Sequence, residues 1–455
     1  MRAFSTLLFV LFALSANAAD GTLGTVSVQK GNNVSVNGEA PLSLTLDGKD
    51  HQSCQFLSKR APDESHEFTW KEVTTTRGGE LAEILGDQLR SVDSLVVKGY
   101  VNDKDFHAMW DASLYGYLSV INLKNAVLEN NAVPDTAFFH ENEQYEGSSH
   151  EIFYYIGLRK IILPEGLEKI GEGAFYQASA LRQVNFPSTL RYIGDFAFNA
   201  TKLEMNQLVI PEGVEEINQY AFAFCRKLKA QVTLPSTIKK IGEWAFYGCP
   251  ITSINLPEGL ESLGSLAFWD CDLREVSIPS SCHEFNEGWQ FGFNRNLEKM
   301  HLPEGMTEIP DHFAVDCFRL REVNFPHTLK HIGEKAFSLC ISLKNVDLPL
   351  GMQSLGEEAF SELEALEQIV FPASMKSLGK NSCSYWKNIK RIYCAAMEPP
   401  VCDPTDGGVF SGFDFPDGFD TPVVYVPKGS INKYKDTSRN CMGWEKFWNY
   451  VEIDP

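Results

Sequence analysis

Prolines recur through the second half of this chain at almost constant intervals, and this periodicity constrains the fold more than any other feature. The steps between them are 22 to 24 residues. The prolines are Pro164, Pro187, Pro211, Pro235, Pro257, Pro279, Pro303, Pro326, Pro349 and Pro372. A period in this range, sustained over ten units, predicts a stack of short repeats in which each turn of the chain packs on its neighbours.

Each repeat carries the same apolar pattern around its proline. The first unit has Leu158, Ile161 and Leu163 before Pro164, then Ile170-Gly171 and Ala174-Phe175. The alternation predicts a short strand with apolar side chains inward, which proline closes. The Ile-Gly step predicts a tight turn that uses the conformational freedom of glycine, and the phenylalanine predicts a ladder of stacked rings. We therefore expect a β-rich leucine-rich-repeat solenoid of about ten 22–24-residue repeats, with N- and C-terminal caps.

Residues 1–18 have the features of a cleavable signal peptide. Arg2 supplies the positive n-region, residues 7–14 are apolar, and Ala16-Asn17-Ala18 is a small-residue cleavage pattern. A membrane-spanning helix needs about 20 apolar residues, and no later stretch is long and apolar enough. We expect a protein that is secreted or held at the cell surface, without a transmembrane segment.

The charge balance narrows the class of partner. The chain has 40 basic and 60 acidic residues, a formal net charge of −20. Nucleic acids and anionic lipid headgroups attract basic surfaces. The balance therefore argues against both as partners.

Five of the eleven cysteines occupy one position of the repeat. They are Cys225, Cys249, Cys271, Cys317 and Cys340, and other repeats have Ala178, Thr201, Asn294 or Leu363 in their place. Small, mostly apolar occupants indicate an interior slot, where cysteine acts as a small hydrophobe. We predict core thiols rather than zinc ligands or disulfides, although an occasional bridge between neighbouring rungs stays geometrically open.

The whole unit, Leu-x-x-Ile-x-Leu-Pro-x-x-Leu-x-x-Ile-Gly-x-x-Ala-Phe-x-x-Cys, resembles the repeat of the BspA-like leucine-rich-repeat family, best known from surface proteins of Bacteroidetes. The resemblance covers about residues 158–390, and the tail around residues 392–402, 424–430 and 444–453 is similar to endings of secreted members. Two units depart from the pattern. Phe285-Asn286 replaces Ile-Gly in one, and the next has Ile309-Pro310 and a reversed Phe313-Ala314. These departures predict a local irregularity near the middle of the array.

The flanks divide into three predicted segments. Residues 19–78 alternate in the manner of strands and could be a small β module or an N-terminal extension. Residues 79–157 read as degenerate repeats that form an N-terminal cap, with strands near 95–97 and 118–123 and helices near 79–89 and 103–110. Residues 158–390 form the solenoid and residues 391–455 a C-terminal cap.

The C-terminal cap contains a candidate disulfide and an aromatic cluster. Cys394 and Cys402 are the candidates for the bridge, with Cys441 as an alternative partner. The aromatic residues are expected to cover the last rung rather than to bind a ligand. They are Trp444, Phe447, Trp448 and Tyr450.

No catalytic or phosphate-binding motif is present in the sequence, so we predict neither enzymatic activity nor a cofactor. The polar cluster from His140 to Glu151 is interpreted as a solvated insertion rather than a metal site. Five aspartates near the C-terminus lack the spacing of an EF-hand and are interpreted as a cap loop rather than a calcium site. They are Asp403, Asp406, Asp414, Asp417 and Asp420.

The concave face of the solenoid is the predicted binding surface. Its outward strand positions lie two residues before each proline, and arginines flank them. The predicted binding residues are Thr233, Asn255, Ser277, His301, Asn324 and Asp347, with Arg274 and Arg321 beside them. A mixed polar strip suits a polar partner held by many weak contacts. For any single residue, a solvated sheet face is the alternative interpretation.

The family resemblance implies a function as well as a fold. It implies an exported, non-catalytic adhesin that engages host extracellular matrix proteins, cells or glycans through the concave face. This step is an analogy, because a fold does not determine a function. An architectural envelope protein, or an enzyme or metal-dependent module within residues 20–150, are the alternatives.

Overall fold

A computed structural model describes residues 66–139, 156–402, 408–412, 422–436 and 443–454, together with the backbone of five strands at 24–29, 33–38, 44–45, 55–57 and 152–154. Three predicted features lie outside the described residues. They are the signal peptide, the polar cluster at 140–151 and the five C-terminal aspartates. The chain divides into two compact units. The first comprises residues 1–187 and 200–203, and the second residues 188–199 and 204–455.

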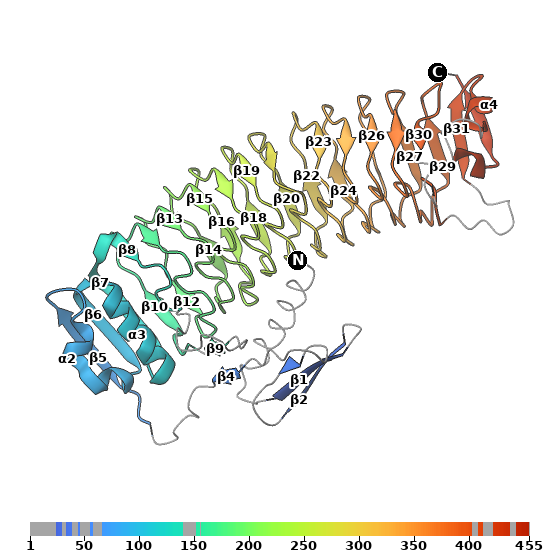
Figure 1. The fold of residues 1–455 in the computed structure, drawn as a ribbon. Helices are drawn as coiled ribbons and strands as arrows, with labels where there is room; N and C mark the ends of the chain where they lie inside the picture. The colour runs from blue at the N-terminus through green and yellow to red at the C-terminus, as the bar shows by residue number, and fades with distance from the viewer. Residues whose placement is uncertain are drawn as a thin grey trace. The chain divides into compact units, whose positions relative to one another are not determined.

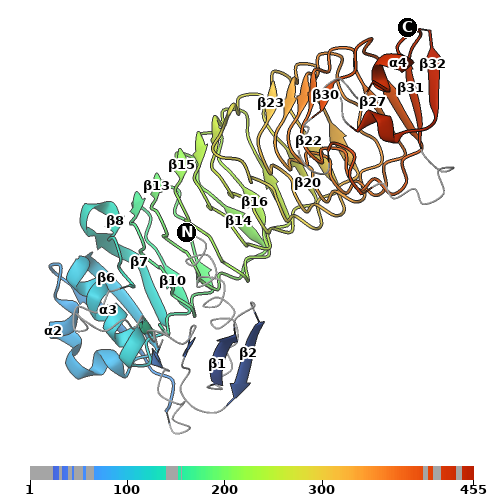
Figure 2. The ribbon, with the colours of Figure 1, turned by 45° about the vertical axis from the view of Figure 1, so that its right-hand side comes forward.

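The first unit is built on a five-stranded parallel sheet (Figures 1 and 2). In spatial order its strands are β12 (Gln183–Val184), β10 (Lys160–Ile162), β7 (Val120–Leu128), β6 (Ser94–Val101) and β5 (Trp70–Thr75). Leu95, Ile121 and Ile161 share one register row across β6, β7 and β10, and all three are buried. The ladder of the repeats therefore extends back through residues 94–128, and it begins with β5, upstream of the expected boundary at residue 79.

Short helices connect these strands close to the expected positions. They are α2 (Leu81–Leu85), the 3-10 helix η2 (Gly86–Arg90) and α3 (Asp103–Tyr115). The Asn102 side chain accepts a hydrogen bond from the Lys104 backbone N at 3.1 Å, and Asp105 accepts one from the Asn102 backbone N at 3.0 Å. This capping box satisfies amide groups that the first turn of a helix leaves without partners, so α3 begins at residue 103.

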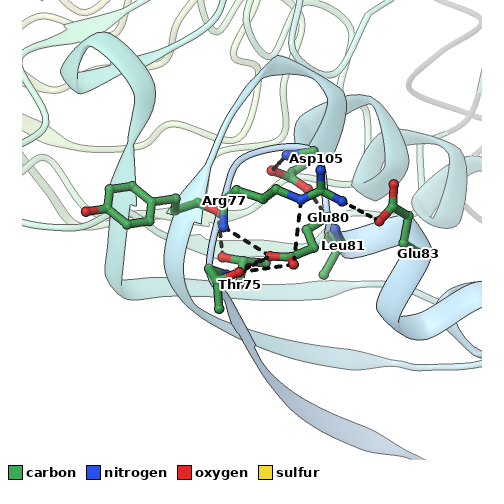
Figure 3. A network of polar contacts seen from close by, with 9 residues as sticks. Thr75, Arg77, Glu80, Leu81, Glu83 and Asp105 are labelled. Atoms are coloured by element: carbon green, nitrogen blue, oxygen red, sulfur yellow. Dashed lines mark hydrogen bonds and ion pairs between the residues drawn. The ribbon is translucent and has the colours of Figure 1, made fainter.

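Figure 3 shows the polar network that ties α2 to α3. The buried carboxylate of Asp105 accepts hydrogen bonds from the backbone N atoms of Gly79 and Leu81 at 2.7 and 2.9 Å. Glu80 accepts one from the Arg77 backbone N at 3.0 Å, and this hydrogen bond lowers the pKa of Glu80. Because these carboxylates satisfy backbone donors around a helix start, the network has a structural role.

The remaining strands of the first unit are short. The 3-10 turn η3 (Glu129–Asn131) leads into β8 (Ala132–Val133), which pairs with β11 (Lys169–Ile170). Further upstream, β1 (Gly24–Gln29), β2 (Asn33–Gly38) and β3 (Leu44–Thr45) form a sheet, and β4 (Gln55–Leu57) pairs with β9 (Ile152–Tyr154). The β1–β2 hairpin falls where the alternating valines predict strands.

The second unit is a coil with two parallel ladders, which run along different sides of the coil in Figures 1 and 2. The wide ladder contains β14 (Gln207–Val209), β16 (Gln231–Thr233) and β18 (Ser253–Asn255); β20 (Glu275–Ser277), β22 (Lys299–His301) and β24 (Glu322–Asn324); and β27 (Gln368–Phe371), β29 (Arg391–Cys394), β31 (Val423–Pro427) and β32 (Tyr450–Ile453). The narrow ladder contains β13 (Tyr192–Ile193), β15 (Glu216–Ile217), β17 (Lys240–Ile241), β19 (Ser262–Leu263) and β21 (Glu284–Phe285), then β23 (Glu308–Ile309), β25 (His331–Ile332), β26 (Ser354–Leu355), β28 (Ser377–Leu378) and β30 (Val401–Cys402).

The expected leucine-rich-repeat solenoid is confirmed. The part of the chain that the structure describes makes about fourteen turns, compared with about ten expected. The difference arises partly because β29, β31 and β32 continue the wide ladder into the segment expected to be a C-terminal cap. Within that segment α4 (Ile431–Tyr434) and the 3-10 helix η5 (Trp444–Lys446) are the described helices.

The expected phenylalanine ladder fills the core. The Phe222 and Phe246 rings stack with centroids 5.3 Å apart and planes 4° apart, and Phe246 and Phe268 do so at 5.6 Å and 9°. The stacking changes to an edge-to-face contact, 76° between planes, where Phe291 meets Phe313. This is the repeat in which the Phe-Ala order is reversed.

The interior slot explains the cysteines. All five are buried thiols, as predicted. Each thiol donates a hydrogen bond to a backbone carbonyl one turn earlier; for example, Cys249 Sγ donates to Phe222 O at 2.9 Å and Cys317 Sγ to Phe291 O at 3.3 Å. Asn294 fills the slot in the irregular repeat, and its Nδ2 donates to Phe268 O at 2.7 Å. The slot therefore accepts a buried side chain that can donate a hydrogen bond to the preceding turn, as the five cysteines and Asn294 do, although Ala178 and Leu363 show that the bond is not required.

The role expected for the Ile-Gly glycine is wrong. Gly264 and Gly356 do not have positive φ angles, so their conformations are open to other residues. A Cβ atom on Gly264 would lie 2.4 Å from Glu243 N, and one on Gly356 would lie 2.6 Å from Glu334 N. Glycine is required because successive turns bring their backbones too close for a side chain.

The irregularity expected near the middle of the array is confirmed as a break in the narrow ladder between β21 and β23. In regular repeats the glycine N donates to the turn before, as Gly264 N does to Ile241 O at 2.8 Å and Gly333 N does to Ile309 O at 2.8 Å. Pro310 occupies the glycine position in the repeat at the break, and proline has no N–H. The ladder therefore ends at β21 and restarts at β23.

Two expectations for the C-terminal segment need correction. Cys394, at the end of β29, and Cys402, at the end of β30, are both buried free thiols rather than a disulfide. Trp444 and Phe447 are buried as expected of a cap, whereas the Trp448 side chain is 73% exposed.

Candidate binding face

The outward side chains of the wide ladder, here called the wide-ladder face, include most of the predicted binding residues. Thr233 on β16 pairs with Asn255 on β18. Ser277, His301 and Asn324 pair in register across β20, β22 and β24. Residues that are 22 to 24 positions apart in the sequence thus lie side by side on adjacent strands.

Strand alternation keeps these residues at the surface. The middle residues of β16, β20 and β22, namely Val232, Val276 and Met300, are buried in the core. Because successive side chains of a strand point to opposite faces, the residues on either side face outward. Thr233 and Ser277 are exposed, and His301 is half-exposed.

The asparagines of the face have a structural task that the sequence did not reveal. Asn324 Oδ1 accepts a hydrogen bond from Leu302 N at 2.9 Å, and its Nδ2 donates to Leu302 O at 2.9 Å. Asn255 Oδ1 accepts from Leu234 N at 3.1 Å. Both leucines directly precede a proline, which cannot continue the ladder. These amides therefore hold the ends of neighbouring strands together.

Rungs without asparagine make the same connection through the backbone. Ile210 N donates to Thr233 O at 3.0 Å, and Ile278 N donates to His301 O at 3.0 Å. The side chains of Thr233 and His301 are consequently not needed to close these strands. They are better placed than Asn255 and Asn324 to contact a partner.

Charged residues flank the row. His301 Nε2 lies 3.2 Å from Glu275 Oε1, and Lys299 forms an ion pair with Glu322 at 3.3 Å. Arg274 and Arg321, also predicted as site residues, are exposed just before β20 and β24. The face therefore carries both signs of charge.

Asp347 lies apart from this arrangement. It is exposed, but residues 343–349 form no ladder strand, so no strand pairing aligns it with the row. The wide ladder resumes with β27.

Sequence reasoning missed an apolar continuation of the wide-ladder face. Val370, Tyr393, Tyr425 and Val451 share one register row across β27, β29, β31 and β32. The two tyrosine rings stack with centroids 4.5 Å apart and planes 12° apart. The shared x-Tyr-x pattern of Ile392-Tyr393-Cys394 and Val424-Tyr425-Val426 was the available signal. This pattern lies beyond Pro372, where the regular proline period ends, and within the segment expected to be a C-terminal cap.

The described residues contain neither a cluster of metal ligands nor a membrane-spanning helix. Within the described ranges, no group of three or more histidine, cysteine or carboxylate side chains could hold a metal ion. No helix in the described part of the chain has the length and apolar character needed to cross a membrane.

The chain is similar to solved leucine-rich-repeat structures. A leucine-rich repeat protein from Bacteroides ovatus is 20% identical, with a TM-score of 0.59, over 95% of this chain and 98% of the other. A leucine rich cell surface protein from Faecalibacterium prausnitzii is 21% identical over 62% of this chain and 83% of the other, with a TM-score of 0.33. No curated protein matches the sequence.

A family model decides the classification. The model of the BspA type leucine-rich repeat region matches in six copies, over residues 148–231, 230–337 and 312–397. These matches span more than half of the 455 residues. The chain therefore belongs to the BspA-type leucine-rich-repeat family.

Proposed function

We propose that this chain is an exported, non-catalytic binding protein, an adhesin that engages host matrix proteins, cells or glycans through the wide-ladder face. The observation that supports this most strongly is the registration of outward polar side chains in two neighbouring groups of strands, Thr233 with Asn255 on β16 and β18, and Ser277 with His301 and Asn324 on β20, β22 and β24. Thr233, Ser277 and His301 are the proposed contacts. Asn255 and Asn324 hold the ends of neighbouring strands together, and Arg274 and Arg321 flank the row, whereas Asp347 lies apart from it.

The geometry suits recognition of an extended surface. Parallel strands place equivalent side chains about 4.8 Å apart, so the row offers regularly spaced hydrogen-bonding groups along the coil. Each contact is weak in water, but a rigid scaffold presents many of them without the cost of ordering a loop. The signal-peptide pattern of residues 1–18 supports the proposal of export, and the membership of a repeat-scaffold family supports the proposal of a binding role without catalysis.

Binding of the chain from Ala19 onward to immobilised matrix proteins and mucin glycans tests the proposal. The measurements should be made at two salt concentrations, with and without calcium. We expect saturable binding that weakens at least tenfold, or about 1.4 kcal/mol, when Thr233, Ser277 and His301 are all replaced by alanine.

A matched control uses three exposed residues of the narrow ladder, Glu284, Glu308 and His331, also replaced by alanine. This variant should bind like the wild type. Equal losses in both variants would contradict the assignment of the face. Absence of binding across the panel would instead favour an architectural role.

A further inference from the structure

The apolar row at the C-terminal end of the wide-ladder face differs in chemistry from the polar row before it. Val370 is 46% exposed and Val451 42% exposed, and Tyr393 and Tyr425 are half-exposed between them. Ala395, directly after β29, is also exposed. Apolar side chains gathered on one exposed sheet face are a feature of protein interaction sites.

The orientation of the tyrosine rings narrows the class of ligand. The rings of Tyr393 and Tyr425 are nearly parallel at 4.5 Å, so each covers one face of the other. Val370 and Val451 are the register neighbours on the two outer sides, on strands about 4.8 Å from those of the tyrosines. The row therefore presents ring edges and methyl groups rather than open ring faces. A sugar ring that stacks on an aromatic side chain needs an open face.

Charge at the edge of the row adds a second constraint. Arg391 is exposed and occupies the outward position of β29 before Tyr393. The neighbouring Lys390 forms an ion pair with Glu367 at 3.1 Å, and the hydrogen bond from Lys390 lowers the pKa of Glu367, with a smaller contribution from Arg391. A carboxylate on a partner would complement Arg391 at the edge of an apolar contact.

We propose that this row binds a short apolar segment of a polypeptide that carries an acidic residue beside it, so that the partner of the wide-ladder face is a protein rather than a glycan. The row spans three strand steps of about 4.8 Å, or roughly 14 Å, which matches four to five extended residues. This inference rests on the proposed function, because it assigns the partner class of the same face.

A random peptide array and a glycan array, both probed with the chain from Ala19 onward, test the inference. We expect enrichment of peptides with consecutive apolar residues next to Asp or Glu. Replacing both Tyr393 and Tyr425 by serine should weaken binding of these peptides at least tenfold. The Tyr393→Phe/Tyr425→Phe variant should retain binding, because the ring edges remain.

Two controls keep the outcome interpretable. Tyr192, an exposed tyrosine on the narrow ladder, is replaced by serine and should leave peptide binding unchanged. Thermal unfolding verifies that each variant is folded. If the serine pair proves unfolded, Arg391→Glu replaces it and should weaken the acidic peptides selectively.

The outcomes separate this inference from the proposed function. If alanine at Thr233, Ser277 and His301 abolishes panel binding while Tyr393→Ser/Tyr425→Ser changes nothing, the proposed function stands and the apolar site is overturned. Glycan binding that depends on the two tyrosines would overturn the polypeptide assignment. Absence of binding on the panel and on both arrays would overturn both.

Discussion

At the scale of single residues, one interior position shows what a sequence pattern can and cannot reveal. The sizes of Cys249, Cys317 and their equivalents predicted a buried slot. They did not predict the hydrogen bond that each thiol donates to a carbonyl of the preceding turn. A repeat pattern records which volumes fit a position, whereas the direction of a donor depends on the backbone of the next turn. Asn294 in the same slot becomes understandable only through that bond.

Burial predicts low reactivity for these thiols. It raises the pKa of Cys317 to about 12, and the thiolate is the nucleophilic form. Cys54 and Cys441 lie outside the described residues, so both are replaced by serine for this test. We then expect thiol reagents at pH 8 to label the folded protein slowly, and to label it fully in denaturant. Rapid labelling of the folded chain at Cys317, located by peptide mass analysis, would contradict the buried slot.

Asn324 illustrates a site residue whose main task is structural. Asn324→Ala removes two hydrogen bonds to Leu302 and should lower the free energy of unfolding by about 1 kcal/mol. It should also speed amide exchange at Leu302. Ser277→Ala is the matched change on the same face and should leave stability within about 0.5 kcal/mol. Equal effects of the two substitutions on denaturant midpoints would refute this role.

Tyr247 makes stability sensitive to alkaline pH. Burial raises its pKa to about 12, with Asp270 contributing. Between the unfolded pKa of about 10 and about 12, the unfolded state releases its proton while the folded state keeps it, so stability falls as pH rises. We expect Tyr247→Phe to reduce this loss, measured as unfolding midpoints from pH 9 to 11.5. An unchanged slope would show that Tyr247 does not contribute.

At the scale of elements, the repeats were predictable where the spacing was regular. The strands near residues 161, 232 and 300 follow from alternation, and the disturbance near Pro310 was located from the sequence. The cause of the disturbance could not be predicted in this way. Pro310 disturbs the ladder because it lacks the N–H that would donate to the preceding turn, and only the structure shows which turn that is. The wide-ladder strands β31 and β32 were missed because longer segments separate them and interrupt the proline period.

Close packing of turns makes one class of glycine irreplaceable. Gly356→Ala would place a Cβ 2.6 Å from Glu334 N, and such overpacking costs about 1–3 kcal/mol. Gly351→Ala is the control, because the nearest atom to its Cβ would be 3.9 Å away. We expect Gly356→Ala to lower the melting temperature by several degrees and Gly351→Ala to leave it nearly unchanged. Similar melting temperatures would argue against backbone contact between turns.

At the scale of the whole molecule, the fold class and the polar part of the face were within reach of the sequence. A repeat that recurs every 22–24 residues places equivalent positions one above another, so the spacing alone assigns Ser277 and His301 to one row. The apolar part was out of reach, because it depends on strands that follow the regular repeats. The wide-ladder face therefore changes in character along the coil, from polar at β16–β24 to apolar at β27–β32.

Hydroxyl-radical footprinting of the chain bound to a panel protein that it captures would show which surface the partner covers. We expect His301, Tyr393 and Tyr425 on the wide-ladder face to become protected in the complex, and exposed Tyr192 and Tyr385 outside it to remain reactive. If Tyr192 or Tyr385 became protected while His301, Tyr393 and Tyr425 stayed reactive, the wide-ladder face would not be the binding surface.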